Sequence, residues 1–357
     1  MLTPPLRQKP DMPHSPRPIV SIGAGGIVRD AHMPAYKKAG WKVASVFDTD
    51  SAKAQAVARD FGIPRVCASL SESVSSSPEG AVFDLATPAT AIAEILSALP
   101  DNSAVLMQKP LGLDLAMASE IRAICRRKGL KAAVNLQLRF APNMMAAHDL
   151  VSRGLIGELH DVDVRVTCSR PWHIWKFLYG IPRMEIIYHS IHYVDLVRSF
   201  LGDPAGVWCK TVKHPEMMEL ASTRTAIAFD YGDVLRANIA TNHGHKYGGR
   251  HQESTLKLEG TKGAIVVRMG VNLDYPRGRP DELEYCILGE GTPAWTNVLL
   301  EGQWFPHAFI GPMASLMRFA SGEATTLPTS VEDAWRTMAV IEACHASSDR
   351  GAVTIPL

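Results

Sequence analysis

The feature that most constrains the fold of this sequence is an alternation of short apolar runs and helical segments, which begins at Pro18. The apolar runs span 18–25, 41–48, 81–88 and 103–110. Each run is nearly continuous, as expected of parallel strands that are covered by helices on both faces. This part of the chain is therefore predicted to form a doubly wound, nucleotide-binding α/β sheet.

The pattern changes after about Asn135. A helix is predicted at 143–157 and another at 184–202, and several strands with alternating apolar and polar residues follow. Turn sequences at 231–233 and 260–263 join consecutive strands, which indicates antiparallel neighbours. The second half is therefore predicted to contain a large, mostly antiparallel open sheet.

A length of 357 residues favours two domains. We predict a fold of the α/β class, with a doubly wound Rossmann domain at 18–138 and an α+β domain at 139–357 for substrate binding and oligomerisation. Residues 1–17 hold several prolines among polar residues and are predicted to form a disordered tail. An arm that reaches over a partner subunit is the alternative.

Charge and cysteine content exclude several functional classes. A net charge of +1 gives no electrostatic reason to expect binding to nucleic acid or to a membrane surface. The six cysteines are scattered without a CxxC pair, so we expect free thiols in a reducing cytosol. No apolar stretch reaches about 18 residues, and the first residues lack the core of a signal peptide. We therefore expect a cytoplasmic protein with a small-molecule substrate.

A glycine-rich loop follows the first apolar run, and its candidate cofactor residues are Gly23, Gly25, Gly26 and Ile27. Glycines let such a turn tighten and let backbone amides approach a pyrophosphate at the helix N-terminus. Glycine also serves ordinary turns, and Val28 replaces the third glycine of the usual fingerprint. Asp48, about 20 residues further on, is placed to hold the adenosine ribose, or else to cap the next helix. Because an acid there repels a 2′-phosphate, NAD is favoured over NADP.

Gln108, Lys109 and Pro110 are expected at the carboxyl end of the fifth strand, the edge where open α/β sheets bind ligands. Pro110 disfavours a helical conformation for Lys109 and keeps it extended. A lysine there can hold its ammonium group against a developing alkoxide. The alternative is a solvated surface lysine, the commoner role of a lone lysine.

The predicted helix at 184–202 carries a second set of candidates, which are Tyr188, His189, His192 and Asp195. Tyr188, His192 and Asp195 are spaced by four and three residues, so they share one face of an α-helix. An imidazole beside a carboxylate suits a general base, since it titrates near working pH. A hydrogen-bonded core histidine explains the pattern equally well.

Further motifs occur in a fixed order along the chain. The first half holds the glycine loop followed by His32 and Pro34, then Asp48, Thr87-Pro88, QKPLG at 108–112, and Asn135, Gln137, Arg139 and Pro142. The second half holds His192 with Asp195, Leu201-Gly202, EGTKG at 259–263 and a closing helical segment at 339–351. In order and spacing these motifs resemble the glucose–fructose oxidoreductase and inositol dehydrogenase family, Gfo/Idh/MocA.

The resemblance implies a two-domain fold, NAD or NADP as cofactor, and sugars or polyols as substrates. It also implies that Lys109 and His192 are catalytic. Thr87, Pro88, Gln108 and Lys109 are predicted among the cofactor contacts, where Gln108 can hydrogen-bond a ribose. In the family's usual pattern, Gln108 would be a glutamate.

Two more positions depart from the family pattern. Ile92 stands where the family has a histidine, and Tyr188 stands where an aspartate usually precedes the catalytic histidine by four residues. Tyr188 can donate a hydrogen bond to a substrate oxygen, but it cannot carry the charge of the aspartate. Tyr188 is therefore our third catalytic candidate.

Polar and aromatic side chains, among them Trp172 and His173, gather in a predicted loop of the second half. Together with Arg139 and with Tyr188, His189 and Asp195 of the predicted helix, these two are the candidate substrate residues. Aromatic faces suit a hydroxylated ring, and positive charges such as Arg170 suit a carboxylate or sulfonate. Solvated loops or a subunit interface are the alternative. His243 and His245 could face one way on a strand, but no third ligand is evident, so no metal is expected.

Three hypotheses follow for the function. The first is an NAD-dependent dehydrogenase that transfers a hydride between nicotinamide and a secondary alcohol of a sugar, polyol or sugar acid. The second is a redox-neutral isomerisation or bond cleavage with tightly bound NAD, and the third is a non-catalytic nucleotide-binding regulator. The presence of both Lys109 and His192 counts against the third. The open face of the predicted sheet needs a cover, which predicts a homodimer or homotetramer.

Overall fold

The computed structural model describes residues 5–275, 277–289 and 292–355, and its chain divides into two units. The parallel-sheet unit comprises Lys9–Phe140 and Phe305–Met338. The eight-strand unit comprises Met1–Gln8, Ala141–Trp304 and Ala339–Leu357. Each unit contains its own sheet, which confirms the predicted fold class of a doubly wound domain with an α+β domain.

Five parallel strands form the sheet of the parallel-sheet unit, in the order β2-β1-β3-β4-β5. Their bounds are Ile19–Ile22 for β1, Val43–Phe47 for β2, Val82–Leu85 for β3, Ala104–Gln108 for β4 and Lys131–Asn135 for β5. All residues of β1 and β3 are buried. Because successive side chains point to opposite faces, helices must cover both faces of the sheet. Gln108 thus ends the fourth strand, not the fifth as expected.

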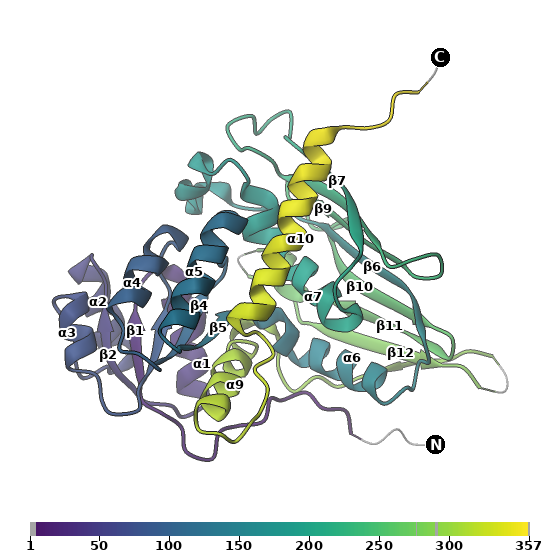
Figure 1. Ribbon diagram of the computed structural model, residues 1–357. Helices are drawn as coiled ribbons and strands as arrows, with labels where there is room; N and C mark the ends of the chain where they lie inside the picture. Colours follow the sequence, from purple (N-terminus) through teal and green to yellow (C-terminus); the bar gives the residue numbers. More distant parts are fainter. Residues whose placement is uncertain (1–4, 276, 290–291, 356–357) are drawn as a thin grey trace. The chain divides into compact units, whose positions relative to one another are not determined.

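Helices α1 to α5 lie between the strands along the chain (Figure 1), and α9 comes from much later in the sequence. Their bounds are Met33–Lys38 for α1, Ser51–Phe61 for α2, Leu70–Ser75 for α3, Ile92–Ala98 for α4, Leu115–Arg127 for α5 and Ile310–Ala320 for α9. Acidic N-caps fix where α2 and α5 begin. The Asp50 carboxylate accepts the first free amides of α2, and Asp114 accepts the amide of Met117 in α5 at 2.8 Å. Such caps satisfy donors that have no partner inside the helix.

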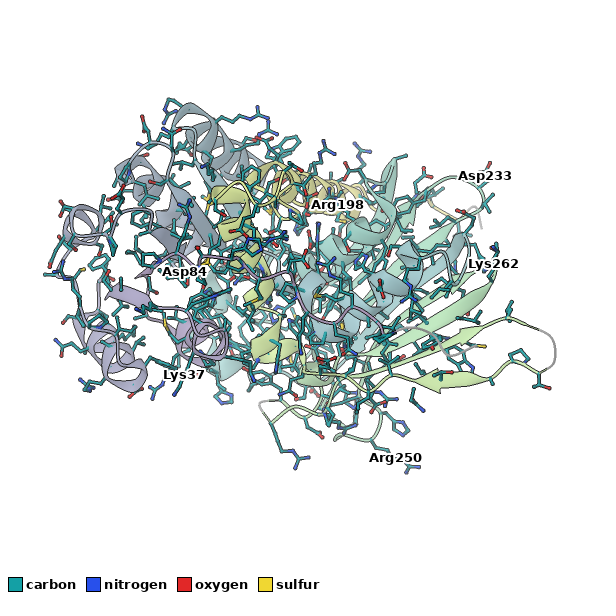
Figure 2. All side chains as sticks on the ribbon, turned by 90° about the horizontal axis from the view of Figure 1, so that it is seen from below. Lys37, Asp84, Arg198, Asp233, Arg250 and Lys262 are labelled. Atoms are coloured by element: carbon teal, nitrogen blue, oxygen red, sulfur yellow. The ribbon has the colours of Figure 1, made fainter. Side chains whose placement is uncertain are left out.

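A buried polar network ties the first helix to this sheet. His32 ends the π-helical turn η1 (Val28–His32), and its Nδ1 lies 2.8 Å from Asp84 Oδ2 in β3. Its Nε2 lies 3.2 Å from the Asn135 amide of β5. Tyr36 donates its hydroxyl to Asp84 at 2.8 Å, and burial together with Asp84 raises the pKa of Tyr36. Figure 2 shows Asp84 among the side chains inside this unit. The network holds the helix that follows the glycine loop in one position.

The segment Phe305–Met338 differs from the predicted domain boundary. It was assigned by sequence to the second domain, but it belongs to the parallel-sheet unit. The reason is that α9 packs on β4 and β5, and its apolar residues join the core that includes Ile19 and Leu106. Helix α10 (Val331–Arg350) contributes residues to both units.

The eight-strand unit is built on a sheet in the order β13-β12-β11-β10-β6-β9-β8-β7. Its strands are Leu159–Thr167 (β6), Gly206–Val212 (β7), Arg224–Asp230 (β8), Arg236–Asn242 (β9), Glu253–Gly260 (β10), Gly263–Arg268 (β11), Glu282–Ile287 (β12) and Trp295–Asn297 (β13). Neighbours are antiparallel except β6 and β9, which pair in parallel. The hairpins predicted at 231–233 and 260–263 join β8 to β9 and β10 to β11.

Helices cover one face of the large sheet. Figure 1 shows α6 (Pro142–Ser152) and α7 (Ile191–Leu201) on this face, and α7 contacts β9 while α6 contacts β11 and β12. The side chains that alternate to the other face are more exposed. In β8, for instance, Ile227 is buried whereas Ala226 and Ala228 are exposed.

The N-terminal segment differs from the predicted disordered tail. Residues 5–17 contain no helix or strand, but they hydrogen-bond within both units. The Arg7 amide donates to Asp149 of α6 at 3.1 Å, and Arg318 of α9 donates to Asp11 at 2.9 Å. Partners from distant parts of the sequence hold this segment, so its composition alone did not predict its state.

Candidate functional site

The glycine loop lies where the strand order of the parallel sheet reverses. β1 and β3 are neighbours there, and Gly23 follows β1 with a φ of 112°, which favours glycine. A Cβ atom on Gly23 would lie 2.4 Å from the Ala86 carbonyl oxygen beyond β3. The reversal leaves a crevice at the carboxyl ends of such strands, and ligands of doubly wound sheets bind at this point.

Asp48 is fixed directly beside this loop. Its Oδ2 accepts the Ala24 amide at 2.7 Å, and its Oδ1 accepts the Asp50 amide at 2.8 Å. Asp50, and not Asp48, caps α2, because the Asp50 carboxylate accepts the helix amides. Asp48 instead orients the loop, and each of its oxygens retains a lone pair for a further donor.

The loop has room for a ligand. A Cβ atom on Gly25 would meet nothing within 4 Å, and one on Gly26 would meet only an Asp30 oxygen at 3.9 Å. Ile27 follows as the half-buried residue that precedes η1. Thr87 adds a buried hydroxyl oxygen with no hydrogen-bond partner in the described part of the chain. Open space, helix-start amides and an unused hydroxyl fit the phosphates and ribose of a dinucleotide.

Two further predicted cofactor residues lie on the same carboxyl edge of the sheet. Pro88 precedes the 3-10 turn η2 (Ala89–Ala91) that leads into α4. Gln108 ends β4, and its side-chain oxygen accepts the Lys109 amide at 3.0 Å. Both Gln108 and Lys109 are half-buried. The segment therefore carries Lys109 at the edge predicted for it.

In the eight-strand unit, the helix with the predicted proton acceptor begins with a π-helical turn. This turn, η6 (Ile186–Ser190), precedes α7. A π-helix turns less per residue than an α-helix, but residues four apart still point in similar directions across it. Tyr188 packs on Phe177 at 5.7 Å between ring centroids, whereas His192 packs edge-on against Trp304 at 5.7 Å. The two rings thus have different aromatic neighbours, and the shared face of Tyr188 and His192 stays a prediction.

The packing partner of His192 is held by a buried carboxylate. Asp281 accepts the Trp304 amide at 2.5 Å and the Gly270 amide at 2.6 Å. Burial raises the pKa of Asp281 to about 6. Trp304 opens the short helix α8 (Trp304–His307) and is 4% exposed. Asp281 was not singled out by sequence, because a single acid in a loop carries no pattern.

The sequence pattern also did not predict a second buried cluster, which is formed by Glu185, His243 and Cys168. Glu185 and His243 are fully buried, with Glu185 Oε1 3.1 Å from His243 Nε2. The other ring nitrogen, His243 Nδ1, lies 3.4 Å from Cys168 Sγ. Burial alone would raise the pKa of the Cys168 thiol, but Arg170 and His243 outweigh burial and lower it. Sequence treated His243 as one of a histidine pair; its inward position on the alternating β9 pattern was the available clue.

This cluster continues into an aromatic group around His189. The His189 ring lies 4.9 Å from the His243 ring, 5.3 Å from Trp172 and 6.3 Å from Trp175. Trp172 opens the 3-10 turn η4 (Trp172–Ile174) and is 5% exposed. Predicted substrate residues His189 and Trp172 are thus brought together.

The remaining predicted residues have different surroundings. Arg139 forms an ion pair with Asp333 at 2.7 Å within the parallel-sheet unit. His173 is exposed, and Asp195 is buried in α7 at 1% exposure. His245 approaches the Gly248 carbonyl oxygen at 3.1 Å. Among the described residues, no group of three or more acidic, histidine or cysteine side chains is placed to hold a metal ion.

A doubly wound sheet with a glycine loop and a fixed acid at its order reversal defines a dinucleotide-binding protein. Residues 18–136 match the model of an oxidoreductase family with an NAD-binding Rossmann fold, and residues 144–266 match the GFO/IDH/MocA C-terminal domain. The chain therefore belongs to the Gfo/Idh/MocA family of oxidoreductases, which confirms the resemblance.

Relatives and solved structures agree with this assignment. A 1,5-anhydro-D-fructose reductase of Ensifer adhaerens is 24% identical over 251 residues, which are 69% of this chain and 74% of that protein. An oxidoreductase from Agrobacterium radiobacter, solved with NAD+, L-tartaric acid and magnesium, has the same fold at 20% identity, with a TM-score of 0.78 over 95% of this chain and 98% of that one. Levoglucosan dehydrogenase, solved with NADH and levoglucosan, has a TM-score of 0.76 at 18% identity, over 94% of this chain and 98% of that one.

No helix in the described part of the chain combines the length and apolar character needed to cross a lipid bilayer.

Proposed function

We propose that this protein is an NAD-dependent dehydrogenase that acts on a secondary alcohol of a sugar, polyol or sugar acid. The observation that carries the proposal is the fixed position of Asp48 beside the glycine loop, in a family of oxidoreductases with an NAD-binding fold. The matching relatives include a reductase of 1,5-anhydro-D-fructose and a dehydrogenase of levoglucosan, both of which act on sugar derivatives. NAD, when bound, accepts the hydride from the alcohol carbon.

The parallel-sheet unit supplies the cofactor contacts. Asp48 has a lone pair on each oxygen for the adenosine ribose, and its charge disfavours a 2′-phosphate. The amides of Gly25, Gly26 and Ile27 serve the pyrophosphate, because Gly25 leaves the space beside them open. The contacts at the other strand ends are assigned to Thr87, Pro88 and Gln108.

Three side chains are assigned to the chemistry. His192 accepts the hydroxyl proton of the substrate as general base. Lys109 holds its positive charge at the oxygen while alkoxide character develops. Tyr188 donates a hydrogen bond to a substrate oxygen, and burial raises its pKa, so it stays protonated in this role. His189 and Trp172 are assigned to substrate contacts.

A screen of sugars, polyols and sugar acids with NAD, followed by the absorbance of NADH, tests the proposal. We expect turnover with at least one substrate, and a loss of about a hundredfold or more in Lys109→Ala, as for loss of a transition-state donor. Full activity of Lys109→Ala would overturn the assigned chemistry. Cofactor released only after denaturation, without net NADH, would favour the redox-neutral alternative.

A further inference from the structure

Arg170 and Trp172 follow the end of β6 and carry unused hydrogen-bond donors. A backbone hydrogen bond of 3.0 Å from the Trp172 amide to the Arg170 carbonyl oxygen closes a tight turn between them. Arg170 Nε and Trp172 Nε1 are both buried atoms without a hydrogen-bond partner in the described part of the chain. Buried donors without an acceptor are rare in native structures, so two of them only two residues apart indicate a missing acceptor.

The Arg170 guanidinium is held in place although no carboxylate holds it. It donates through Nη2 to the side-chain oxygen of Asn272, and it lies 5.5 Å above the ring of Tyr275. Asn272 is fixed in turn, since its amide nitrogen donates to Tyr193 at 3.0 Å and to Ser254 at 2.8 Å. The guanidinium is thus preorganised, with its Nε–H left for another acceptor.

The carboxylates nearby are already paired. Glu185 accepts hydrogen bonds from Ser190 and Thr225 and faces His243. Asp274 is paired with Arg279 at 2.7 Å. Within the described residues, therefore, no carboxylate forms an ion pair with Arg170.

Trp172 lies next to His189, which is assigned to substrate contacts in the eight-strand unit. The Trp172 ring is 5.3 Å from the His189 ring, and His189 precedes His192 by three residues on the same continuous helical segment.

We propose that Arg170 and Trp172 bind a carboxylate of the substrate, so that the alcohol oxidised is part of a sugar acid or another hydroxy acid. The proposal rests on the dehydrogenase function given above. A carboxylate has two oxygens that can accept hydrogen bonds from the two unused N–H donors, and its charge compensates the guanidinium. A neutral sugar would leave that charge uncompensated. The carboxylate itself is unchanged: the hydride leaves the alcohol carbon for NAD, and the hydroxyl proton goes to His192.

Matched acid and neutral compounds test this proposal. D-gluconate with D-glucitol, D-glucuronate with D-glucose, and a set of hydroxy dicarboxylates with the corresponding polyols would be compared by kcat/KM and by calorimetric titration in the presence of NADH. We expect an acid to be the best substrate, with a binding preference over its neutral partner of about 10-fold or more. Trp172→Phe keeps the ring and removes only the N–H, so it should weaken acid binding without abolishing it.

Variants of Arg170 separate charge from structure. Arg170→Met should raise KM for the acid by about 10- to 100-fold and leave kcat/KM for a neutral substrate nearly unchanged. Arg170→Lys should recover part of the loss. Lys176→Met removes an exposed cation from the same loop and should have no effect on the acid preference. Thermal unfolding of each variant checks that the loop remains folded.

The outcomes distinguish this proposal from the proposed function. Oxidation of a neutral compound in preference to every acid, with Arg170→Met unaffected, overturns the carboxylate site and leaves the dehydrogenase intact. Acid binding that depends on Arg170, without any reduction of NAD, supports the carboxylate site and overturns the dehydrogenase. Binding of no acid above its neutral partner overturns the carboxylate site whatever the activity.

Discussion

Glu185 and His243 form an ion pair in the interior of the eight-strand unit, with 3.1 Å between Oε1 and Nε2 and no exposure of either side chain. Hydroxyls of Ser190, Thr225 and Thr241 donate to the same carboxylate. Burial alone would raise the pKa of Glu185 and lower that of His243, but their partners reverse both effects. The pair joins the start of η6 to the end of β9, beside the aromatic group at His189.

The first prediction concerns pH. Burial acts against the charged His243, but Cys168 and Glu185 raise its pKa from 6.5 to about 8. A raised pKa contributes stability below pH 6.5 that is lost as pH rises through 8. Integrated over this interval, the free energy of unfolding should fall by about 2 kcal/mol. Urea unfolding at about pH 6 and about pH 9 measures the difference.

His243→Gln provides the control, because glutamine does not titrate. It should be less stable overall and should lose the pH dependence between 6.5 and 8. Glu185 acts at the acid end: its pKa is lowered, so its contribution is present above its ordinary pKa and is lost as pH falls below it. If the free energy of unfolding of His243→Gln still fell by the same amount above pH 6.5, groups other than His243 would cause the pH dependence.

The second prediction separates two glycines of one loop. Gly23→Ala meets the Ala86 carbonyl oxygen at 2.4 Å and a φ of 112°, so it should lower the free energy of unfolding by about 2 kcal/mol or more. Gly25→Ala meets no atom within 4 Å and should leave stability within about 0.5 kcal/mol, yet weaken NAD binding. Thermal unfolding and NAD titration would be compared. Normal NAD binding by Gly25→Ala would show that this loop does not bind the pyrophosphate.

The third prediction concerns cofactor choice. The Asp48 charge beside the Ala24 amide should make NAD bind about 10-fold or more tightly than NADP. Asp48→Ser should narrow this gap by improving NADP binding and weakening NAD binding. Titration of both cofactors into both proteins measures it. Equal affinities in the unaltered protein would contradict the role of Asp48.

The fourth prediction concerns the proton acceptor. His192→Ala should lower kcat by about 100-fold and flatten the acid limb of the pH–rate profile. Tyr188→Phe removes only a hydroxyl and should lower kcat less, since Tyr188 lies against Phe177 rather than Trp304. If His192→Ala left kcat unchanged, Tyr188 or His189 would be the preferred proton acceptor. Alanine variants of these two residues, measured in the same way, would identify it.

The fifth prediction concerns assembly. The open face of the large sheet carries Trp208, which is 64% exposed, opposite Ala228. Apolar and small side chains on this face suit contact with a second copy, so we expect a homodimer or homotetramer. Ala228→Arg should shift light scattering toward monomer, whereas Val234→Arg, at an exposed turn, should not. A monomer in the unaltered protein at micromolar concentration would contradict the prediction.

Local patterns along the chain determined much of the fold. The apolar runs, the glycine loop and Asp48 predicted the parallel sheet and its ligand edge, because neighbouring residues encode the periodicity and turn geometry of a strand or helix. The hairpins at 231–233 and 260–263 were also predicted from neighbouring residues alone. The π-helical turn η6 was not predicted, since over a few residues it has the same apolar spacing as an α-helix.

Only the tertiary structure decided what lies between distant segments. Cys168 and His243 are 75 residues apart in sequence, and Glu185 is 58 residues from His243, yet they form one cluster. The assignment of α9 to the parallel sheet has the same origin. Such contacts follow from the burial of whole sheets and helices against one another, and the sequence around each residue carries no record of which distant partner will satisfy a buried charge.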